Sequence, residues 1–465
     1  MIAAGIHKFR GKRVLLLQGP LGPFFTRVAA DLHREGAIVY KVNFNGGDWL
    51  FSLAGPWQES INFTQSIGEW PDFFRDLLLR LQIDDVFLFG DCRPIHVPVT
   101  AISRRLRVAV GVFEEGYLRP DYITFERGGV NNRSSLPGDP DFYLARATSP
   151  TEPTRPVGNT FKHAALWGVL YYTAASLGKP VFRHYWHHRP LGAMEGIYWC
   201  QSFYRKLRYR RSEKALTQRL LNSDSNYRYF LVPLQTCGDA QIKVHSRFRS
   251  IPRFIEHVLY SFARSAPDDA ALVIKHHPLD RGYTDYSILI ARLAKRLGLE
   301  SRCHYIHDQH LPTLLQKAEG VVVVNSTVGL SAVGEGVPVK VCGEAIYDMA
   351  GLTFQGDLDG FWEGASTFRA DGELWNAFRT YLISRTQING SFYRKIAGLG
   401  SRTGVAWASL AGVANAPALR PEMPVGSTAA TAALLAAFKE ASPAVSARPR
   451  TARAELPIED LASAN

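Results

Sequence analysis

Short apolar runs alternate with segments of helical periodicity along most of the chain, in two separate series. Alternation of this kind is typical of α/β proteins with parallel sheets. We expect strands at residues 13–19, 38–44, 85–90 and 108–116 in the first series, and at 229–235, 271–277, 303–307, 320–326 and 337–343 in the second. Two such series predict two Rossmann-like domains that face a cleft, with ligands at the carboxyl ends of the strands.

Changes in composition divide the chain further. The segment between the two series mixes aromatic residues with a dense run of Arg and Lys, and the end of the chain is rich in Ala, Pro, Ser and Thr. A tail of that composition favours disorder. We therefore predict Rossmann-like domains at residues 1–154 and 226–400, a basic and aromatic connection at 155–225, and a mostly disordered, mobile tail at 401–465.

The charge balance indicates an anionic partner. The 465 residues include 54 Lys and Arg against 42 Asp and Glu, a formal net charge of +12. Nucleic acid, anionic lipid and a phosphorylated substrate all fit this excess, as does a generic basic surface. The five cysteines form no C-x-x-C pair, which favours a reducing compartment and argues against structural zinc. With no signal peptide and no apolar run long enough to span a bilayer, we expect a cytoplasmic protein.

The sequence "KHHP" ends the expected strand at 271–277. Pro278 cannot continue a sheet ladder and restricts His277 to an extended conformation. An ammonium from Lys275 and imidazoles from His276 and His277 at a strand end suit a phosphate or a leaving nucleotide. The alternative is a loop with two surface histidines.

Two other strand ends carry polar side chains. Asn325, Ser326 and Thr327 follow the strand at 320–326 and can cap the next helix, whose N-terminus favours anions. "PLQTCGDAQ" at 233–241 places Gln235, Asp239 and Gln241 after another strand. These three residues fit either a surface turn or a carboxylate held by amides and aimed at a reacting carbon.

The first series offers a pair of carboxylates at a strand end. Glu114 and Glu115 would repel each other, and one of them would then keep a raised pKa, as a general acid or base needs. A solvated turn is the alternative. The Gly-rich turn at 18–25 matches neither G-x-G-x-x-G nor the Walker pattern.

Taken together, "EEGYLRPDYIT", "PLQ…D-A-Q", "KHHP" and "NSTVGL…GVPV" resemble the capsule polysaccharide biosynthesis and export family of Gram-negative bacteria, and its KpsS/LipB branch most closely. The resemblance covers about residues 10 to 400, in the same order. It implies a GT-B-like fold with an acceptor-side first domain, and a retaining β-Kdo glycosyltransferase that uses CMP-Kdo as donor and needs no metal or other cofactor.

The resemblance also implies roles for residues. The nucleophile maps to Asp239, supported by Gln235 and Gln241, although the spacing departs from the family's Q-x-D-x-Q-like motif. Glu115 is the first choice for acid/base and Glu114 the second. The donor nucleotide would be bound by Lys275, His276, His277, Pro278, Asn325, Ser326 and Thr327.

The branch that the sequence resembles adds the first Kdo of a poly-Kdo linker to a (lyso)phosphatidylglycerol-type lipid. This implies a peripheral position on the inner face of the inner membrane and, as further partners, other capsule biosynthesis or export proteins. A basic surface would then meet the lipid head groups. Its residues are Arg205, Lys206, Arg208, Arg210, Arg211 and Lys214. A linker with buried aromatics and solvated arginines is the alternative.

Three other functions are alternatives, and the third is weaker than the first two. A sialyltransferase of the same fold would use CMP-sialic acid, and a non-catalytic capsule assembly or export factor would need neither Asp239 nor Glu115. Nucleic-acid binding is supported by charge alone, because no helix-turn-helix or RNA-binding sheet pattern accompanies the basic run, and we expect no nucleic-acid partner.

Overall fold

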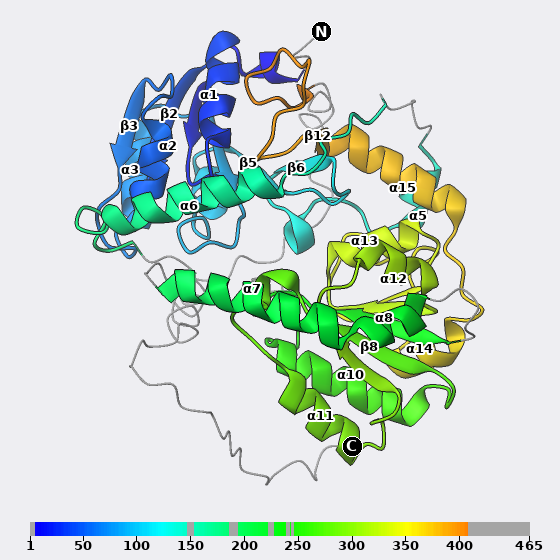
Figure 1. Ribbon diagram of the computed structural model, residues 1–465. Coiled ribbons are helices and arrows are strands. Elements are labelled where there is room, and N and C mark those ends of the chain that lie inside the picture. The colour runs from blue at the N-terminus through cyan, green and yellow to red at the C-terminus, as the bar shows by residue number, and fades with distance from the viewer. Residues whose placement is uncertain are drawn as a thin grey trace. The chain divides into compact units, whose positions relative to one another are not determined.

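The computed structural model describes residues 5–146, 153–185, 194–221, 227–238, 242 and 246–407. Two β-sheets organise this part of the chain (Figure 1). The predicted fold class, two Rossmann-like α/β units in a GT-B-like chain, is confirmed by their topology. The tail was predicted to begin at residue 401, but residues 401–407 pack against the first part of the chain, where Trp407 is buried and its indole donates to Asp31 at 3.0 Å. The rest of the predicted tail, beyond residue 407, lies outside the described residues. No helix among the described residues is both long and apolar enough to cross a membrane.

The first sheet has seven strands in the order β12-β6-β5-β4-β1-β2-β3. Strands β1 to β5 are parallel, while β6 is antiparallel to β5 and β12 is antiparallel to β6. The strands are β1 (Arg13–Leu16), β2 (Ile38–Asn43), β3 (Glu59–Asn62), β4 (Asp85–Phe89), β5 (Ala109–Glu115), β6 (Tyr122–Arg127) and β12 (Gln387–Asn389). The helical segments in this part are η1 (Ile6–Phe9), α1 (Phe24–Arg34), α2 (Gly46–Ser52), α3 (Trp70–Arg80), α4 (Val99–Arg105), η2 (Asn131–Arg133) and α5 (Pro140–Leu144).

The second sheet has five parallel strands in the order β11-β10-β7-β8-β9. They are β7 (Tyr229–Pro233), β8 (Ala271–Lys275), β9 (Cys303–Ile306), β10 (Gly320–Val323) and β11 (Val339–Val341). The helical segments that follow β7 are α10 (Ile251–Ser265), η3 (Pro278–Asp280), α11 (Ser287–Arg296), α12 (Leu311–Lys317), α13 (Thr327–Gly334), α14 (Leu358–Gly364) and α15 (Gly372–Arg385). Three further helices, α6 (Phe161–Leu177), α7 (Met194–Ser212) and α8 (Lys214–Leu221), lie between the two series of strands in the sequence.

All nine strands expected from the sequence are present, and each begins within one or two residues of its predicted start. Three strands, β3, β6 and β12, were not predicted. Strand β3 alternates half-buried with exposed residues, and β12 has only three residues, so neither has a strong apolar signal. Strand β12 falls within residues 226–400, which the sequence groups with the second sheet, yet it pairs with β6 of the first.

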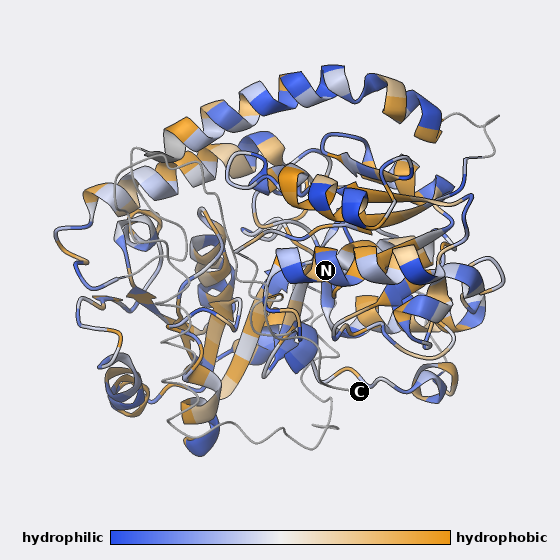
Figure 2. Cartoon of the chain, turned by 90° about the horizontal axis from the view of Figure 1, so that it is seen from below, coloured by the Kyte–Doolittle hydropathy of each residue, from blue (hydrophilic) through white to orange (hydrophobic). Residues whose placement is uncertain are grey.

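Apolar strands sandwiched between helices form the cores of both sheets, and the strands are largely orange in Figure 2. Strand β8 is buried along its whole length, as expected for the interior of a parallel sheet. Helix α10 presents an apolar stripe to this sheet, where Phe262 and Phe230 pack edge-to-face against Trp362. Burial of each such aromatic side chain contributes roughly 2 to 3 kcal/mol. A rigid sheet therefore fixes the positions of the strand ends.

Candidate functional site

Three of the predicted motifs meet at the carboxyl edge of the second sheet. Strand β7 lies between β8 and β10, so the "KHHP" and "NST" motifs flank the end of β7. Gln235, just after β7, donates from Nε2 to Oδ1 of Asn325 at 3.1 Å. On the other side, the carboxylate of Asp280 accepts from the backbone N–H of Cys237. The residues that follow β7 are thus tied to both neighbouring motifs.

The "KHHP" motif divides into a buried half and a more exposed half. Lys275 and His276 are buried, and the Lys275 ammonium donates to the carbonyl oxygen of His307 at 3.1 Å. Burial lowers the pKa of Lys275 to about 8. Burial, helped by the nearby His307, lowers the pKa of His276 to about 4 and keeps this imidazole neutral at pH 7. His277 is half-buried and Pro278 is exposed.

The backbone restriction predicted for His277 is present. This residue is extended, with φ −77° and ψ 127°, and it precedes the short helix η3. Its Nδ1 accepts from the backbone N–H of Leu279 at 3.2 Å, which fixes the orientation of the ring. The Nδ1 of His276 shares a 2.6 Å hydrogen bond with the Tyr305 hydroxyl, while its Nε2 is buried without a partner among the described residues. The two imidazoles therefore differ in environment.

Helix α13 begins as the sequence predicts. Ser326 is its N-cap, and its hydroxyl accepts from the backbone N–H of Val328 at 3.2 Å. The Tyr347 hydroxyl donates to the carbonyl oxygen of Ser326 and packs against Gly329, where an added Cβ would lie 2.3 Å from that hydroxyl. The N-terminus of α13, which is the positive end of the helix dipole, thus lies just after the carboxyl end of β10.

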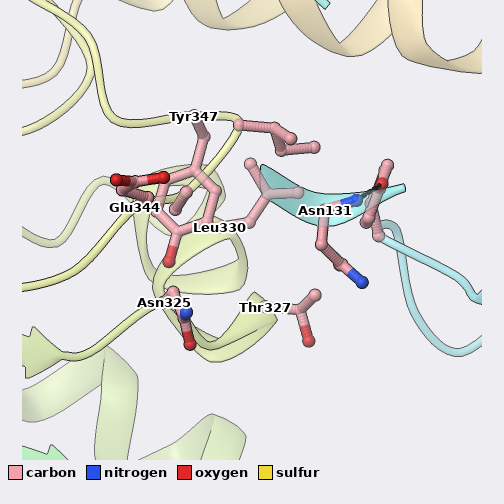
Figure 3. Close-up of a pocket in the computed structure, with 9 residues that line it drawn as sticks. Asn131, Asn325, Thr327, Leu330, Glu344 and Tyr347 are labelled. Atoms are coloured by element: carbon pink, nitrogen blue, oxygen red, sulfur yellow. Dashed lines mark hydrogen bonds between the residues drawn. The ribbon is translucent and has the colours of Figure 1, made fainter. Parts of the chain in front are cut away.

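A shallow pocket opens beside this helix start and includes residues from both series (Figure 3). Asn325 and Thr327 line one side, and Asn131 lies opposite with its side chain extending toward Thr327. The Tyr117 hydroxyl, another lining group, donates to Glu126 at 2.6 Å and accepts from the backbone N–H of Asn131 at 2.7 Å. The other lining residues are Leu330, Glu344, Ala345, Ile346 and Tyr347.

The two candidate glutamates end strand β5, and their side chains point to opposite faces of the sheet because strand residues alternate. Burial raises the pKa of Glu114 to about 7, with a smaller contribution from the charge of Glu115. Desolvation, rather than the mutual repulsion inferred from the sequence, is thus the main cause of the shift. The Glu115 carboxylate instead accepts from the Tyr393 hydroxyl at 3.0 Å.

A buried polar network surrounds the carboxyl ends of β1 and β2, and the sequence analysis missed it. Gln18 donates to Asp48 at 3.0 Å and accepts from Arg93 at 2.8 Å, and the Tyr171 hydroxyl donates to Asp48 at 3.0 Å. Lys41 is buried, donates to two backbone carbonyls, and has its pKa lowered to about 8 by burial. Applying the strand-end rule to β1 and β4 would have indicated Gln18 and Arg93.

A second shallow pocket lies against this network. The turn at residues 18–25, which carries no nucleotide motif, supplies part of its lining together with Lys41, Asp48 and Tyr171. Its other lining residues are Gly19, Pro20, Gly22, Phe25, Thr26, Gly47 and Phe51. One basic side chain and one carboxylate therefore border a small cavity at the edge of the first sheet.

Residues of the predicted basic surface lie on α7 and at the start of α8. Most are exposed, namely Lys206, Arg208, Arg210, Arg211 and Lys214. Arg205 is half-buried, and its guanidinium donates to the carbonyl oxygens of Arg281 at 2.7 Å and Thr284 at 3.2 Å. It therefore anchors α7 close to the "KHHP" strand end. The predicted nucleophile Asp239 and its neighbour Gln241 lie outside the described residues.

Two Rossmann-like sheets with polar side chains gathered at their carboxyl edges give this chain a fold of the GT-B type. The chain belongs to the capsule polysaccharide biosynthesis family: the model of the family described as "Capsule polysaccharide biosynthesis protein" matches residues 84–393. The resemblance inferred from the sequence is thereby confirmed.

Two curated relatives match over most of their length. The capsule polysaccharide export protein KpsS of Escherichia coli is 41% identical over 389 residues, which cover 82% of this chain and 97% of the relative. The capsule polysaccharide modification protein LipB of Neisseria meningitidis serogroup B is 38% identical over 394 residues, covering 83% and 92%. Among solved structures, the KpsC β Kdo 2,7 transferase of Thermosulfurimonas dismutans has a TM-score of 0.36 and 16% identity, covering 73% of this chain and 82% of that one.

Proposed function

We propose that this protein is a retaining glycosyltransferase that moves Kdo from CMP-Kdo to a (lyso)phosphatidylglycerol-type lipid and so starts the linker of a capsular polysaccharide. The observation that carries the proposal is the convergence of three motifs at one sheet edge: Gln235 bonds to Asn325, and the backbone of Cys237 to Asp280. Membership of the capsule family supports the biological setting.

The donor nucleotide is assigned to the edge formed by β7, β8 and β10. There the α13 N-terminus, capped by Ser326, offers backbone N–H groups to a phosphate, and Thr327 supplies a hydroxyl beside the pocket. Lys275 and His277 approach from the other flank of β7. Because these groups can stabilise a leaving nucleoside monophosphate by themselves, we expect no requirement for a metal. Transfer should therefore persist in EDTA.

The proposed chemistry has two displacements. The carboxylate of Asp239 attacks the anomeric carbon of Kdo, the bond from that carbon to the CMP phosphate oxygen breaks, and CMP leaves. The acceptor hydroxyl then attacks the same carbon from the opposite side, displaces Asp239 and gives up its proton to a general base. For that base we propose Glu114 ahead of Glu115, because a pKa of about 7 suits proton transfer at neutral pH.

The lipid acceptor accounts for the basic surface. Exposed Lys and Arg side chains on α7 and α8 are suited to anionic head groups, each contributing roughly 1 kcal/mol near a charged membrane. Arg205 holds this helix against the loop that follows "KHHP", so the basic surface and the proposed donor site share a scaffold. A peripheral position on the inner face of the inner membrane follows from this assignment.

A mass-resolved transfer assay tests the proposal. Purified protein is mixed with CMP-Kdo and a short-chain phosphatidylglycerol analogue, with Asp239→Ala as the inactive variant and Gln241→Ala as a matched neighbour that keeps the carboxylate. We expect a product heavier by one Kdo with the wild type and Gln241→Ala, and none with Asp239→Ala. Equal product from Asp239→Ala would contradict the assigned nucleophile.

Two other outcomes are informative. Product from CMP-sialic acid but not from CMP-Kdo would keep the fold and the two-step chemistry while changing the sugar. Absence of both transfer and CMP binding would support a non-catalytic role in the capsule system; the name of the Escherichia coli relative assigns that protein to capsule polysaccharide export. In that case Asp239→Ala in cells should leave capsule production intact.

A further inference from the structure

Helix α6 is apolar on two faces, only one of which is covered by the protein. Gly168, Tyr171 and Ala175 are buried on the inner face. By helical periodicity Leu166, Leu170 and Leu177 lie on the opposite side, and they are exposed, from 39% for Leu170 to 77% for Leu177. Val169, on the flank of that side, is exposed as well. A helix that is apolar all round is normally buried in a core or in a membrane. Its outer face therefore lacks a partner in the described chain.

The exposed face does not arise from loose packing of α6. A Cβ on Gly46 of α2 would lie 2.1 Å from the carbonyl oxygen of Ala174, so the two helices are in direct backbone contact. The Tyr171 hydroxyl bonds to Asp48 at 3.0 Å and to Asn45 at 2.8 Å, and the indole of Trp167 donates to the Tyr393 carbonyl at 3.2 Å. The inner face is thus fixed to the first sheet, and the outer face is presented rigidly.

The surrounding charge favours an anionic partner. Residues 155–221 contain twelve Lys and Arg against two Glu, so this connecting segment carries most of the chain's net charge of +12. One of the two, Glu213, is buried and bonded to His307 at 2.6 Å. Exposed apolar side chains occur among the basic ones on α7 as well. They include Ile197, Trp199, Phe203 and Leu207.

We propose that the outer face of α6 is a docking surface for an anionic lipid bilayer, with its leucines in the acyl boundary and the cations of the connecting segment over the head groups. A helix of 17 residues is too short to span the bilayer, but it can lie in the interface. The inference deepens the proposed function, because a lipid acceptor has to be taken from a bilayer.

Vesicle flotation of the full chain tests the docking surface. The variant Leu166→Ser/Leu170→Ser/Leu177→Ser is compared with Leu79→Ser/Leu144→Ser/Ile288→Ser, which alters three exposed apolar residues elsewhere. Both are measured with vesicles of phosphatidylcholine alone and of phosphatidylcholine with phosphatidylglycerol in equal parts. Because the altered side chains are exposed, neither variant should unfold, and the melting temperature checks this.

We expect wild type and control variant to bind the phosphatidylglycerol vesicles equally, and the α6 variant to bind at least about tenfold more weakly, since burying one leucine is worth roughly that factor. Equal binding by the α6 variant would overturn the inference, as would failure of the wild type to bind. A wild-type dimer that dissociates in the α6 variant would show that a second copy covers the helix instead.

Transfer assays separate this inference from the proposed function. With a water-soluble acceptor the α6 variant should match the wild type, and with the acceptor embedded in vesicles it should fall at least tenfold. If the wild type transfers nothing in either format while α6-dependent vesicle binding persists, the transferase assignment fails and the docking surface stands.

Discussion

The carboxyl edges of the two sheets share a position in the fold but differ in chemistry. At the first edge, burial raises the pKa of Glu114 to about 7, and the polar groups of Gln18, Asp48 and Arg93 satisfy one another. The second edge offers a capped helix N-terminus, a half-buried imidazole at His277 and a cation at Lys275. Desolvation thus raises the pKa of a carboxyl to near neutrality at one edge, while the other edge gathers a helix N-terminus and basic side chains.

The largest expected effect at the first edge comes from removing the proposed proton-transfer group, Glu114. Glu114→Gln should lower kcat about 10²- to 10⁴-fold, the usual contribution of a general base, with CMP affinity unchanged. The wild-type rate should fall as the pH drops below about 7, where Glu114 becomes protonated. Steady-state kinetics across pH check this, with Glu115→Gln as the matched control. A greater loss in Glu115→Gln would reverse the assignment of the two glutamates.

The raised pKa of Glu114 also predicts how the stability of the protein depends on pH. Because burial raises its pKa, the folded state holds the proton more tightly than the unfolded state, so ionisation of Glu114 reduces stability as the pH rises from about 4.5 to about 7. The melting temperature of Glu114→Gln relative to the wild type should therefore be higher at pH 8 than at pH 5. A difference independent of pH would show that the carboxyl is not desolvated.

At the second edge the largest effect should come from Lys275. Lys275→Met is expected to weaken CMP binding roughly tenfold or more, the range for a charged hydrogen-bonding group. Since the pKa of Lys275 is about 8, wild-type affinity should fall as the pH rises through that value and the variant should show no such fall. Calorimetric titration between pH 6.5 and pH 9 measures both. If the CMP affinity of Lys275→Met also fell with rising pH, a group other than Lys275 would cause the pH dependence.

Removing the cap of α13 should have the smallest effect. Ser326→Ala loses the hydrogen bond to the Val328 N–H and should cost about 1 kcal/mol of unfolding free energy. Denaturant titration measures this, and Ser326→Thr, which keeps a hydroxyl, should recover most of the loss. If CMP affinity also falls in Ser326→Ala, the helix start contacts the phosphate as proposed. Unchanged affinity would limit Ser326 to capping.

Strands with a strong apolar signal were predictable from the sequence, and so was the convergence of polar strand ends. The pattern of buried runs fixed β7, β8 and β10, and the parallel arrangement then required Gln235, His277 and Asn325 to lie at one edge. The order of the strands was not predictable in the same way. Strand β7 lies in the middle because it pairs with both β8 and β10, and pairing between strands far apart in the chain has no local signal in the sequence.

The buried network of the first edge was missed for a different reason. Lys41 lies within strand β2 and resembles an exposed lysine in the sequence, yet it is buried and bonded to the Leu17 and Val42 carbonyls. Likewise, α6 has apolar residues all round, so no amphipathic pattern separates its covered face from its exposed one. Both features depend on which neighbours pack against the element.

We propose that the second edge binds the donor and that Glu114 at the first edge transfers the proton. This assignment is tested most directly by measuring CMP affinity and single-turnover transfer for His277→Ala and Glu114→Gln side by side. We predict that His277→Ala weakens CMP binding about tenfold while retaining transfer at saturating donor, and that Glu114→Gln binds CMP as the wild type does but transfers at least a hundredfold more slowly. The opposite pattern, with CMP binding lost in Glu114→Gln and unchanged in His277→Ala, would contradict the assignment of the donor to the second sheet.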